Sequence, residues 1–502
     1  MKQKVQMVLF SCALAVFFYN VLRFGLSSFT IGQFDEPLRI LTHRYVTQGL
    51  ELYKDVGVVY PPGPAWLIGW AIPFYSMFQR NLIFTTGTTV LLLFIILQIK
   101  QVLRCVWTDV RLSFFLLIAV LYLTFVPGEP FSWTLLALLS VVYVKYIFKN
   151  SAIDVPQLFM IGFAIPFFRW DHALLFFIVQ AVGIISLLLI SIVRDEKDLR
   201  PDRASQVLAP AFIGYVVGII TIAAAFFFNG SVKEAYEFII HIPSNVIMEY
   251  RKLPLPHITA PRILNAMLYI SLAVWTMVSL VSCKARQHRG HLFLILLLPF
   301  SYVPYATGRA DWMHAVPLLM TVALVVLFLS SLLESKKVYI LCFSILLLPI
   351  TRLLIPSNNS FSIVPNKTQI EMDVELQDCK QVSRKIDPRS IFVGRESYQR
   401  FIVNTVALYL LKPTARPATR YISDEPGIQN DCEYGARIVT DLRHAPKPML
   451  AFIELGEQKV EQNKTQYMQS CGVVESYLHQ STFVPVGSCT AFDQKYDVRV
   501  YP

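Results

Sequence analysis

The residues whose types suit catalysis lie at the ends of long apolar runs. Asp35 and Glu36 follow the first apolar run of the chain, and Glu129 stands between two later runs. A carboxylate in a sheltered cleft can act as a general base when its surroundings tune its pKa. We therefore predict Asp35, Glu36 and Glu129 as the catalytic candidates. The alternative for Asp35 and Glu36 is a purely structural role, because carboxylates also cap helix N-termini.

A second set of polar residues occupies similar positions beside the apolar runs. Charged groups at membrane depth are costly and usually face a cavity or a partner. We predict substrate contacts for the following residues: Arg309, His314, Arg169, Lys54, Asp171, Asp311, Tyr53 and Tyr60. The alternatives are structural ion pairs between the neighbouring arginines and aspartates, and anchoring at the membrane interface for the two tyrosines.

These residues belong to a chain with the composition of a membrane protein. Its 502 residues are 55% hydrophobic and only 16% charged, whereas a soluble domain has about 25% charged residues. This composition argues against an ordinary cytosolic enzyme, a disordered chain, a collagen or a small disulfide framework. The net charge of +11 lies wholly in residues 1–355, because residues 356–502 carry 17 basic and 17 acidic side chains. The bases punctuate apolar runs instead of clustering on one face, so we expect no nucleic-acid partner.

Residues 1–355 are predicted to form a mainly α, polytopic transmembrane helical bundle of about eleven spans. The apolar runs approach the roughly 20 residues that cross a bilayer. They are 5–28, 81–99, 112–127, 133–148, 156–168, 173–193, 207–228, 263–283, 291–306, 316–333 and 338–355. The short linkers on one side hold most of the bases, and the positive-inside rule places that side in the cytoplasm. The N-terminus is then cytoplasmic, the first run is a retained helix, and the chain after residue 355 emerges on the outer side.

The first outer segment, within residues 30–80, is expected to contain surface helices. Four apolar residues can share one face of a helix over 38–50, namely Leu38, Leu41, Tyr45 and Leu50. Arg39, Thr42, His43 and Gln48 lie largely away from that face. This pattern is typical of an amphipathic helix resting on a membrane surface. We expect the apolar stretch 62–78 to lie along the outer surface as well.

Residues 356–502 are predicted to form a soluble exocytoplasmic α/β or α+β domain. Short β-rich runs at 390–394, 449–453 and 497–501 alternate with helical stretches at 398–411 and 433–442. Four cysteines lie in this domain: Cys379, Cys432, Cys471 and Cys489. An even number of cysteines outside the cytoplasm favours two disulfides, with three pairings open. The alternative is four unpaired thiols.

The ordered set of motifs resembles the GT-C class, polytopic glycosyltransferases that use polyprenyl-phosphate sugars. The class includes the bacterial aminoarabinose transferases and the dolichyl-phosphate-mannose protein mannosyltransferases. The resemblance rests on Asp35-Glu36 after the first helix and on the stretch from Gly49 to Gly63, and it extends to His314. The pattern Arg416-Pro-Ala-Thr-Arg-Tyr421 followed by Pro426-Gly427 resembles the domains appended to bacterial members.

The resemblance implies an inverting transfer at the outer membrane face. Asp35 would accept the proton of the acceptor as it attacks the anomeric carbon, and the lipid phosphate would leave. Arg309 is our first candidate for binding that phosphate, because a guanidinium contacts phosphate in bidentate fashion. Two positions depart from the pattern: Glu129 stands where the class commonly has Asp, and Tyr60 stands where aminoarabinose transferases have a phosphate-contacting Lys.

The expected partners are a polyprenyl-phosphate-linked sugar donor, membrane lipids, and a glycan, lipid or protein acceptor. No cofactor is firmly predicted. A divalent metal on Asp35, Glu36 and Glu129 is an alternative, since carboxylate oxygens are its usual ligands. The expected location is the bacterial inner or plasma membrane. The rival functions are a transporter or lipid-glycan flippase, and a non-catalytic envelope assembly subunit whose exposed domain binds partners.

Overall fold

The computed structural model divides the chain into two compact units. It describes residues 35–66, 130–149, 154–194, 202–247, 289–303, 374–398, 405–423, 427–456, 470–479 and 482–502, together with Thr321 and Val325. The first unit comprises Met1–Gly25, Asn81–Thr221 and Leu255–Ile363. The second comprises Leu26–Arg80, Ile222–Pro254 and Val364–Pro502. The domain that follows residue 355 in the sequence is thus joined in its unit by two earlier segments of the chain.

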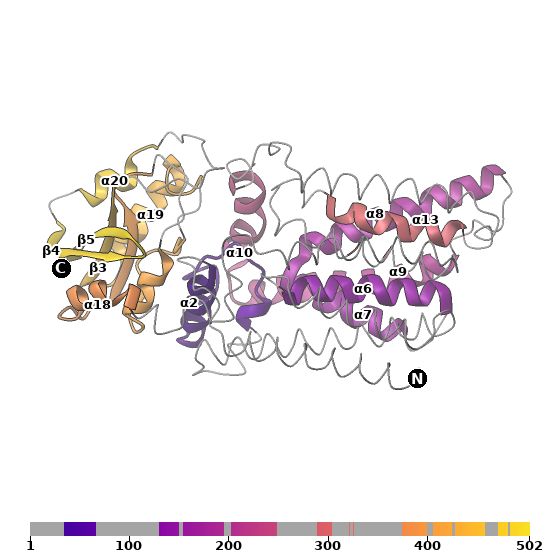
Figure 1. The fold of residues 1–502 in the computed structure, drawn as a ribbon, viewed down its shortest axis with the longest axis horizontal. Helices are drawn as coiled ribbons and strands as arrows, with labels where there is room; N and C mark the ends of the chain where they lie inside the picture. Colours follow the sequence, from indigo (N-terminus) through magenta and orange to yellow (C-terminus); the bar gives the residue numbers. More distant parts are fainter. Residues whose placement is uncertain are drawn as a thin grey trace, which may run out of the picture. The chain divides into compact units, whose positions relative to one another are not determined.

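The first unit is helical wherever the structure describes it (Figure 1). Its helices are α6 (Pro130–Lys149), α7 (Asp154–Ala164), α8 (Pro166–Arg194), α9 (Asp202–Phe228, in this unit as far as Thr221), α13 (Arg289–Leu297) and the 3₁₀ helix η4 (Leu298–Tyr302). Two segments among the described residues are long and apolar enough to cross a membrane, Pro166–Val193 and Ala204–Phe228. Large apolar side chains such as Ile192 and Ile213 are exposed on these helices. Exposed apolar surface of this kind suits contact with lipid.

The described helices coincide with five of the eleven predicted spans. The other six lie outside the described residues, apart from Thr321 and Val325: 5–28, 81–99, 112–127, 263–283, 316–333 and 338–355. The structure separates two helices at Ile165, between α7 and α8, which is earlier than the predicted break between 156–168 and 173–193. At the predicted break it has a kink. The helix α8 continues through this point, although Arg169 has non-helical backbone angles, φ −157° and ψ 82°.

Close packing of α7 on α9 depends on glycine. A Cβ added at Gly162 would overlap the carbonyl of Ala211, and one added at Gly214 would overlap the carbonyl of Phe159. Small residues allow helix backbones to approach closely, a common feature of helix pairs in membranes. A buried hydrogen-bond chain ties three other helices: Tyr143 of α6 donates to Gln180 of α8 at 3.0 Å, and Gln180 donates to the Leu294 carbonyl of α13 at 3.2 Å.

The second unit contains a five-stranded mixed sheet with the order β2-β1-β3-β5-β4, of which Figure 1 labels β3, β5 and β4. The strands are β1 (Ser390–Arg395), β2 (Arg416–Pro417), β3 (Met449–Leu455), β4 (Val484–Ala491) and β5 (Gln494–Tyr501). β1 pairs in parallel with β2 and β3, whereas β5 is antiparallel to β3 and β4. β1 and most of β3 are buried, as expected for central strands with near-continuous apolar sequence. The mixture of strands and helices predicted for residues 356–502, called the tail or tail domain below, is therefore confirmed.

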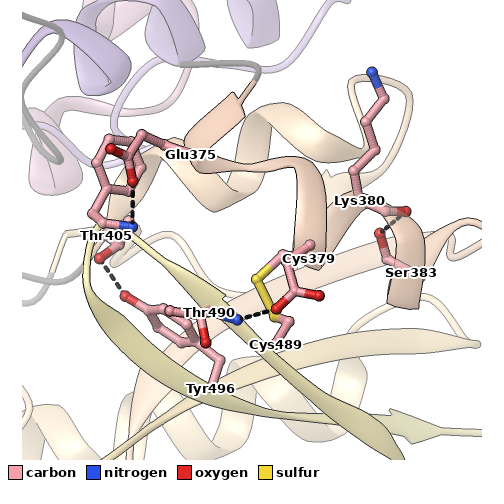
Figure 2. Close-up of a disulfide and its surroundings, with 10 residues drawn as sticks. Glu375, Cys379, Lys380, Ser383, Thr405, Cys489, Thr490 and Tyr496 are labelled. Atoms are coloured by element: carbon pink, nitrogen blue, oxygen red, sulfur yellow. Dashed lines mark hydrogen bonds between the residues drawn. A yellow bond between two sulfur atoms is a disulfide. The ribbon is translucent and has the colours of Figure 1, made fainter. Parts of the chain in front are cut away.

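Helices cover this sheet and two disulfides brace it. α18 (Gln377–Ser383) packs along β4, and α19 (Cys432–His444) packs on α20 (Val473–Leu478). Asp431 caps α19 by accepting hydrogen bonds from the N–H groups of Glu433 and Tyr434. Of the three pairings left open by the sequence, the structure has Cys379–Cys489 and Cys432–Cys471. Figure 2 shows the first of them joining α18 to β4. The N–H of Thr490 on β4 also donates to Asp378 of α18 at 2.7 Å.

Among its described residues, the second unit also contains helices from far earlier in the sequence. These include α2 (Asp35–Thr47), α10 (Val232–Tyr236) and the π-helix η2 (Glu237–Ile247). π-Helical segments are rare and are found frequently at functional sites. The predicted helix at 398–411 is described only as the 3₁₀ helix η5 (Val406–Leu411), with residues 399–404 lying outside the described part.

Candidate functional site

The catalytic candidates Asp35 and Glu36 are the first two residues of α2. The sequence Asp-Glu-Pro suits a helix start, because carboxylates interact favourably with the N-terminal dipole and proline fits the first turn. The backbone position is thus described, whereas the two side chains lie outside the described part of the structure. The third catalytic candidate, Glu129, lies outside it altogether, as do Arg309, Asp311 and His314.

Protein contacts bury the apolar face of α2. Leu38, Leu41 and Tyr45 are at most 1% exposed, and α2 packs on η5 of the tail domain. The predicted helix with its shared apolar face is present, but that face packs on protein instead of resting on a lipid surface. Thr42 and His43, expected on the polar side, are buried as well. More of α2 is buried than the four-residue apolar pattern predicts.

The loop after α2, residues 48–60, is called the first-loop segment or first loop below. It is anchored by Tyr53. Its side chain is fully buried, and its hydroxyl donates to the carbonyl of Tyr60 at 2.7 Å. Its ring contacts Phe226 edge-on at 5.2 Å and stacks on Phe238 at 6.3 Å. Burial raises the pKa of the Tyr53 phenol well above its ordinary value. Tyr53 also has a positive φ of 69°, which a non-glycine residue adopts only when its surroundings hold it there.

Lys54 and Asp55 lie on the exposed side of the same loop. Lys54 forms an ion pair with Glu51 at 2.9 Å, and this carboxylate raises the pKa of the Lys54 ammonium group. Asp55 accepts a hydrogen bond from the backbone N–H of Glu51 at 2.8 Å. Two residues further on, the N–H of Gly57 donates to the carbonyl of Arg420 at 2.8 Å. The first-loop segment is therefore hydrogen-bonded directly to the tail domain.

A cavity of about 220 Å³ opens where the first-loop segment meets the tail domain. Its lining is rich in charge and otherwise made of small or apolar residues. The lining residues are Leu50, Lys54, Asp55, Arg416, Pro417, Ala418, Thr419, Arg420, Asp441, His444, Ala445 and Pro446. All of them belong to the second unit. Sequence reasoning placed the Arg416–Tyr421 motif in the tail, but it assigned no site to it.

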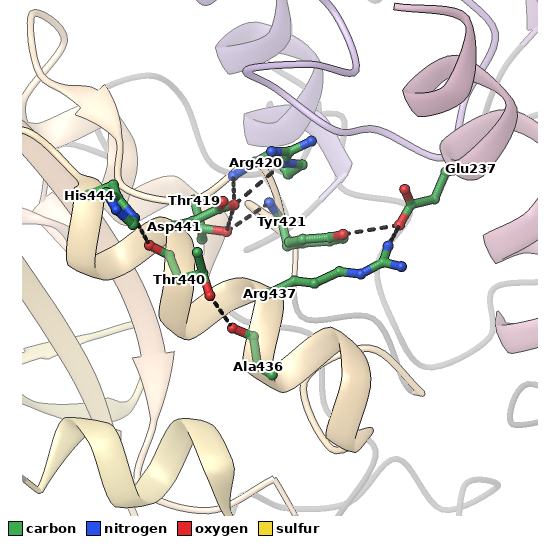
Figure 3. Close-up of polar contacts among 9 residues, drawn as sticks. All are labelled: Glu237, Thr419, Arg420, Tyr421, Ala436, Arg437, Thr440, Asp441 and His444. Atoms are coloured by element: carbon green, nitrogen blue, oxygen red, sulfur yellow. Dashed lines mark hydrogen bonds and ion pairs between the residues drawn. The ribbon is translucent and has the colours of Figure 1, made fainter.

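A second polar cluster joins η2 to the tail domain (Figure 3). Glu237 accepts a hydrogen bond from the Tyr421 hydroxyl at 3.0 Å and another from the Arg437 guanidinium at 2.7 Å. Burial, first, and then the Glu237 charge raise the pKa of Tyr421 above its ordinary value. Burial and the same carboxylate raise the pKa of neighbouring Tyr434 to about 12. In Figure 3, Asp441 lies close by and binds the Thr419 hydroxyl at 3.0 Å.

The first unit carries a charged corner at the kink of α8. Arg169 lies 3.8 Å from Asp171, and its guanidinium is 3.3 Å from the ring of His172. His172 is 1% exposed and meets the Tyr302 ring edge-on. The neighbouring Trp170 carbonyl accepts a hydrogen bond from Tyr215 at 3.0 Å. Sequence reasoning found Arg169 and Asp171 and missed His172, although all three stand in one five-residue motif.

Metal binding by the described residues would require a group of side chains that could hold the ion. Within the described ranges, no three His, Cys, Asp or Glu side chains are grouped so as to hold a metal ion. The metal ligands considered from the sequence are Asp35, Glu36 and Glu129, and their side chains lie outside those ranges.

No family model and no curated protein sequence matches this chain.

Proposed function

We propose that this chain is a membrane glycosyltransferase that moves a sugar from a polyprenyl-phosphate donor to an acceptor at the outer membrane face. One observation carries the proposal beyond the sequence resemblance: the helix that begins at Asp35-Glu36 is packed into a unit with the tail domain. A loop that merely connected two spans would need no such burial. A catalytic carboxylate, in contrast, must be held in position by rigid surroundings.

The proposed chemistry is an inverting displacement. Asp35 takes the proton of the acceptor hydroxyl or amine, which attacks the anomeric carbon while the lipid phosphate departs. Positive groups stabilise the departing phosphate, with Arg309 first and with Arg169, His314 and Lys54 as further candidates. Glu36 and Glu129 are the other carboxylates proposed for the reaction. The tail domain binds acceptor or covers the site.

The proposed topology is a multi-pass membrane protein with a cytoplasmic N-terminus and an outer tail domain. The three segments that form the second unit, 26–80, 222–254 and 364–502, are largely those that the basic linkers place on the outer side. A compact unit cannot be divided by a bilayer, so their packing together supports this assignment. The apolar helices α8 and α9 support a membrane location for the first unit.

The test is sugar transfer by the purified full-length protein in proteoliposomes. The probes are radiolabelled polyprenyl-phosphate sugars, offered together with an extract of lipid-linked glycans as acceptors. We expect label to leave the donor and appear in an acceptor with the opposite anomeric configuration. Movement of intact labelled donor between leaflets, with no transfer, would contradict the proposal and favour the flippase.

A further inference from the structure

The cavity between the first-loop segment and the tail domain has the composition of a binding site for a small polar ligand. Its apolar walls are Leu50 and four shorter side chains, Pro417, Ala418, Ala445 and Pro446. Charged and hydrogen-bonding side chains converge on the same space from α19, from the first loop, from β2 and from the segment after β2. Polar groups that converge on a concave surface fix the orientation of a bound ligand, and this lining is richer in them than a typical ligand site.

Among the described residues, the ion pairs around this cavity leave two charged lining side chains without a salt bridge, Arg416 and Asp55. Lys54 is paired with Glu51 at 2.9 Å, and Arg420 lies 3.5 Å from Asp441. Arg416 is exposed, and within the described part of the chain its guanidinium has no side-chain partner. A guanidinium presents a planar fork that matches the two oxygens of a carboxylate or phosphate. Arg416 is therefore the group available to bind an oxyanion.

Other lining groups are set to bind hydroxyls. The Nδ1 of His444 lies 2.8 Å from the Thr440 carbonyl, which can only accept, so Nδ1 carries the proton. In the neutral ring this leaves Nε2 as an acceptor for a ligand hydroxyl. Asp55 uses one carboxylate oxygen, Oδ2, to hold the Glu51 N–H, and its other oxygen can accept a further hydroxyl.

The volume of the cavity suits a ligand of about one sugar ring. A cavity of about 220 Å³ equals about seven water molecules at roughly 30 Å³ each. It is smaller than the roughly 300–1,000 Å³ of sites for drug-sized molecules.

We propose that this cavity binds a sugar bearing an oxyanion, either phosphate or carboxylate, with Arg416 on the oxyanion and His444 and Asp55 on the hydroxyls. In the setting of the proposed transferase, on which this biological role rests, the ligand is an anionic sugar of the acceptor. Binding itself is measured without donor, so it succeeds or fails separately from transfer.

The experiment measures binding of four probes to the full-length protein in detergent by titration calorimetry and saturation-transfer NMR. The probes are glucose 1-phosphate, glucuronate, glucose and inorganic phosphate. We expect at least one of the two anionic sugars to bind at least tenfold tighter than glucose and inorganic phosphate. The anionic sugar that binds shows whether the oxyanion is a phosphate or a carboxylate. Equal binding of glucose, or of inorganic phosphate alone, would overturn the proposal.

Variants then locate the binding. Arg416→Gln should weaken binding of the anionic sugar at least tenfold. Arg416→Lys keeps the charge without the planar guanidinium, so its affinity should lie between those of wild type and Arg416→Gln. Arg384→Gln is the matched control, because Arg384 is an exposed arginine of the same unit outside the cavity. It should change binding less than twofold. Unchanged binding in Arg416→Gln, or equal loss in Arg384→Gln, would overturn the assignment to this cavity.

Discussion

The carboxylate of Glu237 and the guanidinium of Arg437 lie 2.7 Å apart, although 200 residues separate them in the sequence. The Glu237 side chain is only 11% exposed, and the Tyr421 hydroxyl donates to the same oxygen. This contact ties the π-helix η2 to α19 of the tail domain. It explains how a segment between two apolar runs becomes part of the second unit.

Removing the Arg437 guanidinium should loosen this connection. Hydrogen bonds to charged groups contribute about 1.5–3 kcal/mol when buried, and Arg437 is 42% exposed. We therefore expect Arg437→Met to lower the free energy of unfolding by about 1–2 kcal/mol, allowing for solvent screening. Thermal unfolding of the full-length protein measures it, with Arg384→Met as control. An Arg437→Met protein as stable as the control would show that the ion pair contributes nothing.

The two disulfides should differ in their contribution to stability. Cys379–Cys489 closes a separation of 110 residues and Cys432–Cys471 one of 39 residues. Chain entropy predicts that the longer loop stabilises more, by about 1 kcal/mol. The pair Cys379→Ala/Cys489→Ala should therefore unfold more readily in denaturant than Cys432→Ala/Cys471→Ala. The reverse order would mean that strain or residual structure outweighs loop length.

Lys447 should make the second unit more stable as the pH rises above 8. Burial lowers the pKa of Lys447 from 10.5 to about 8 in the folded chain, where its ammonium lies 3.6 Å from the Tyr501 ring centroid. Between pH 8 and 10.5 the unfolded chain binds more protons at this position, so stability rises with pH across that window. Lys447→Met should flatten the rise, whereas exposed Lys385→Met should not. An unchanged slope in Lys447→Met would contradict the lowered pKa.

Glycine packing between α7 and α9 should tolerate no methyl group. Gly214→Ala places a Cβ on the Phe159 backbone, which cannot move aside without shifting a helix. Overpacking of this kind costs about 1–3 kcal/mol. Gly183→Ala is the control, because its Cβ meets only the flexible ends of Leu294 and Leu297. We expect a lower melting temperature in detergent for Gly214→Ala than for Gly183→Ala, and equal temperatures would refute the close approach.

Local patterns predicted local structure well. Apolar runs at 390–394, 449–453 and 497–501 lie within β1, β3 and β5, and the helical stretch 433–442 lies within α19. Leu38, Leu41 and Tyr45 were expected on one face and are buried together. These features depend on spacing within a single element, which the sequence displays directly.

Contacts across long separations were not predictable in the same way. Nothing in the residues around Glu237 marks Tyr421 and Arg437 as its partners, because the fold alone brings them together. The same holds for the cavity, whose walls combine the first loop with Arg416 and His444. The Arg416–Tyr421 motif was the one available signal, and its role emerged only once the fold placed Lys54 and Asp55 beside it.

The most direct test of the proposed function is transfer by Asp35→Asn compared with wild type, in proteoliposomes at matched protein amounts. Removing a general base costs about 10²–10⁴-fold in rate, so we expect at least a hundredfold loss with donor binding retained. Asp387→Asn, an exposed aspartate of the same unit, is the control and should transfer normally. Transfer by Asp35→Asn within twofold of wild type would contradict the assignment of Asp35 as the base.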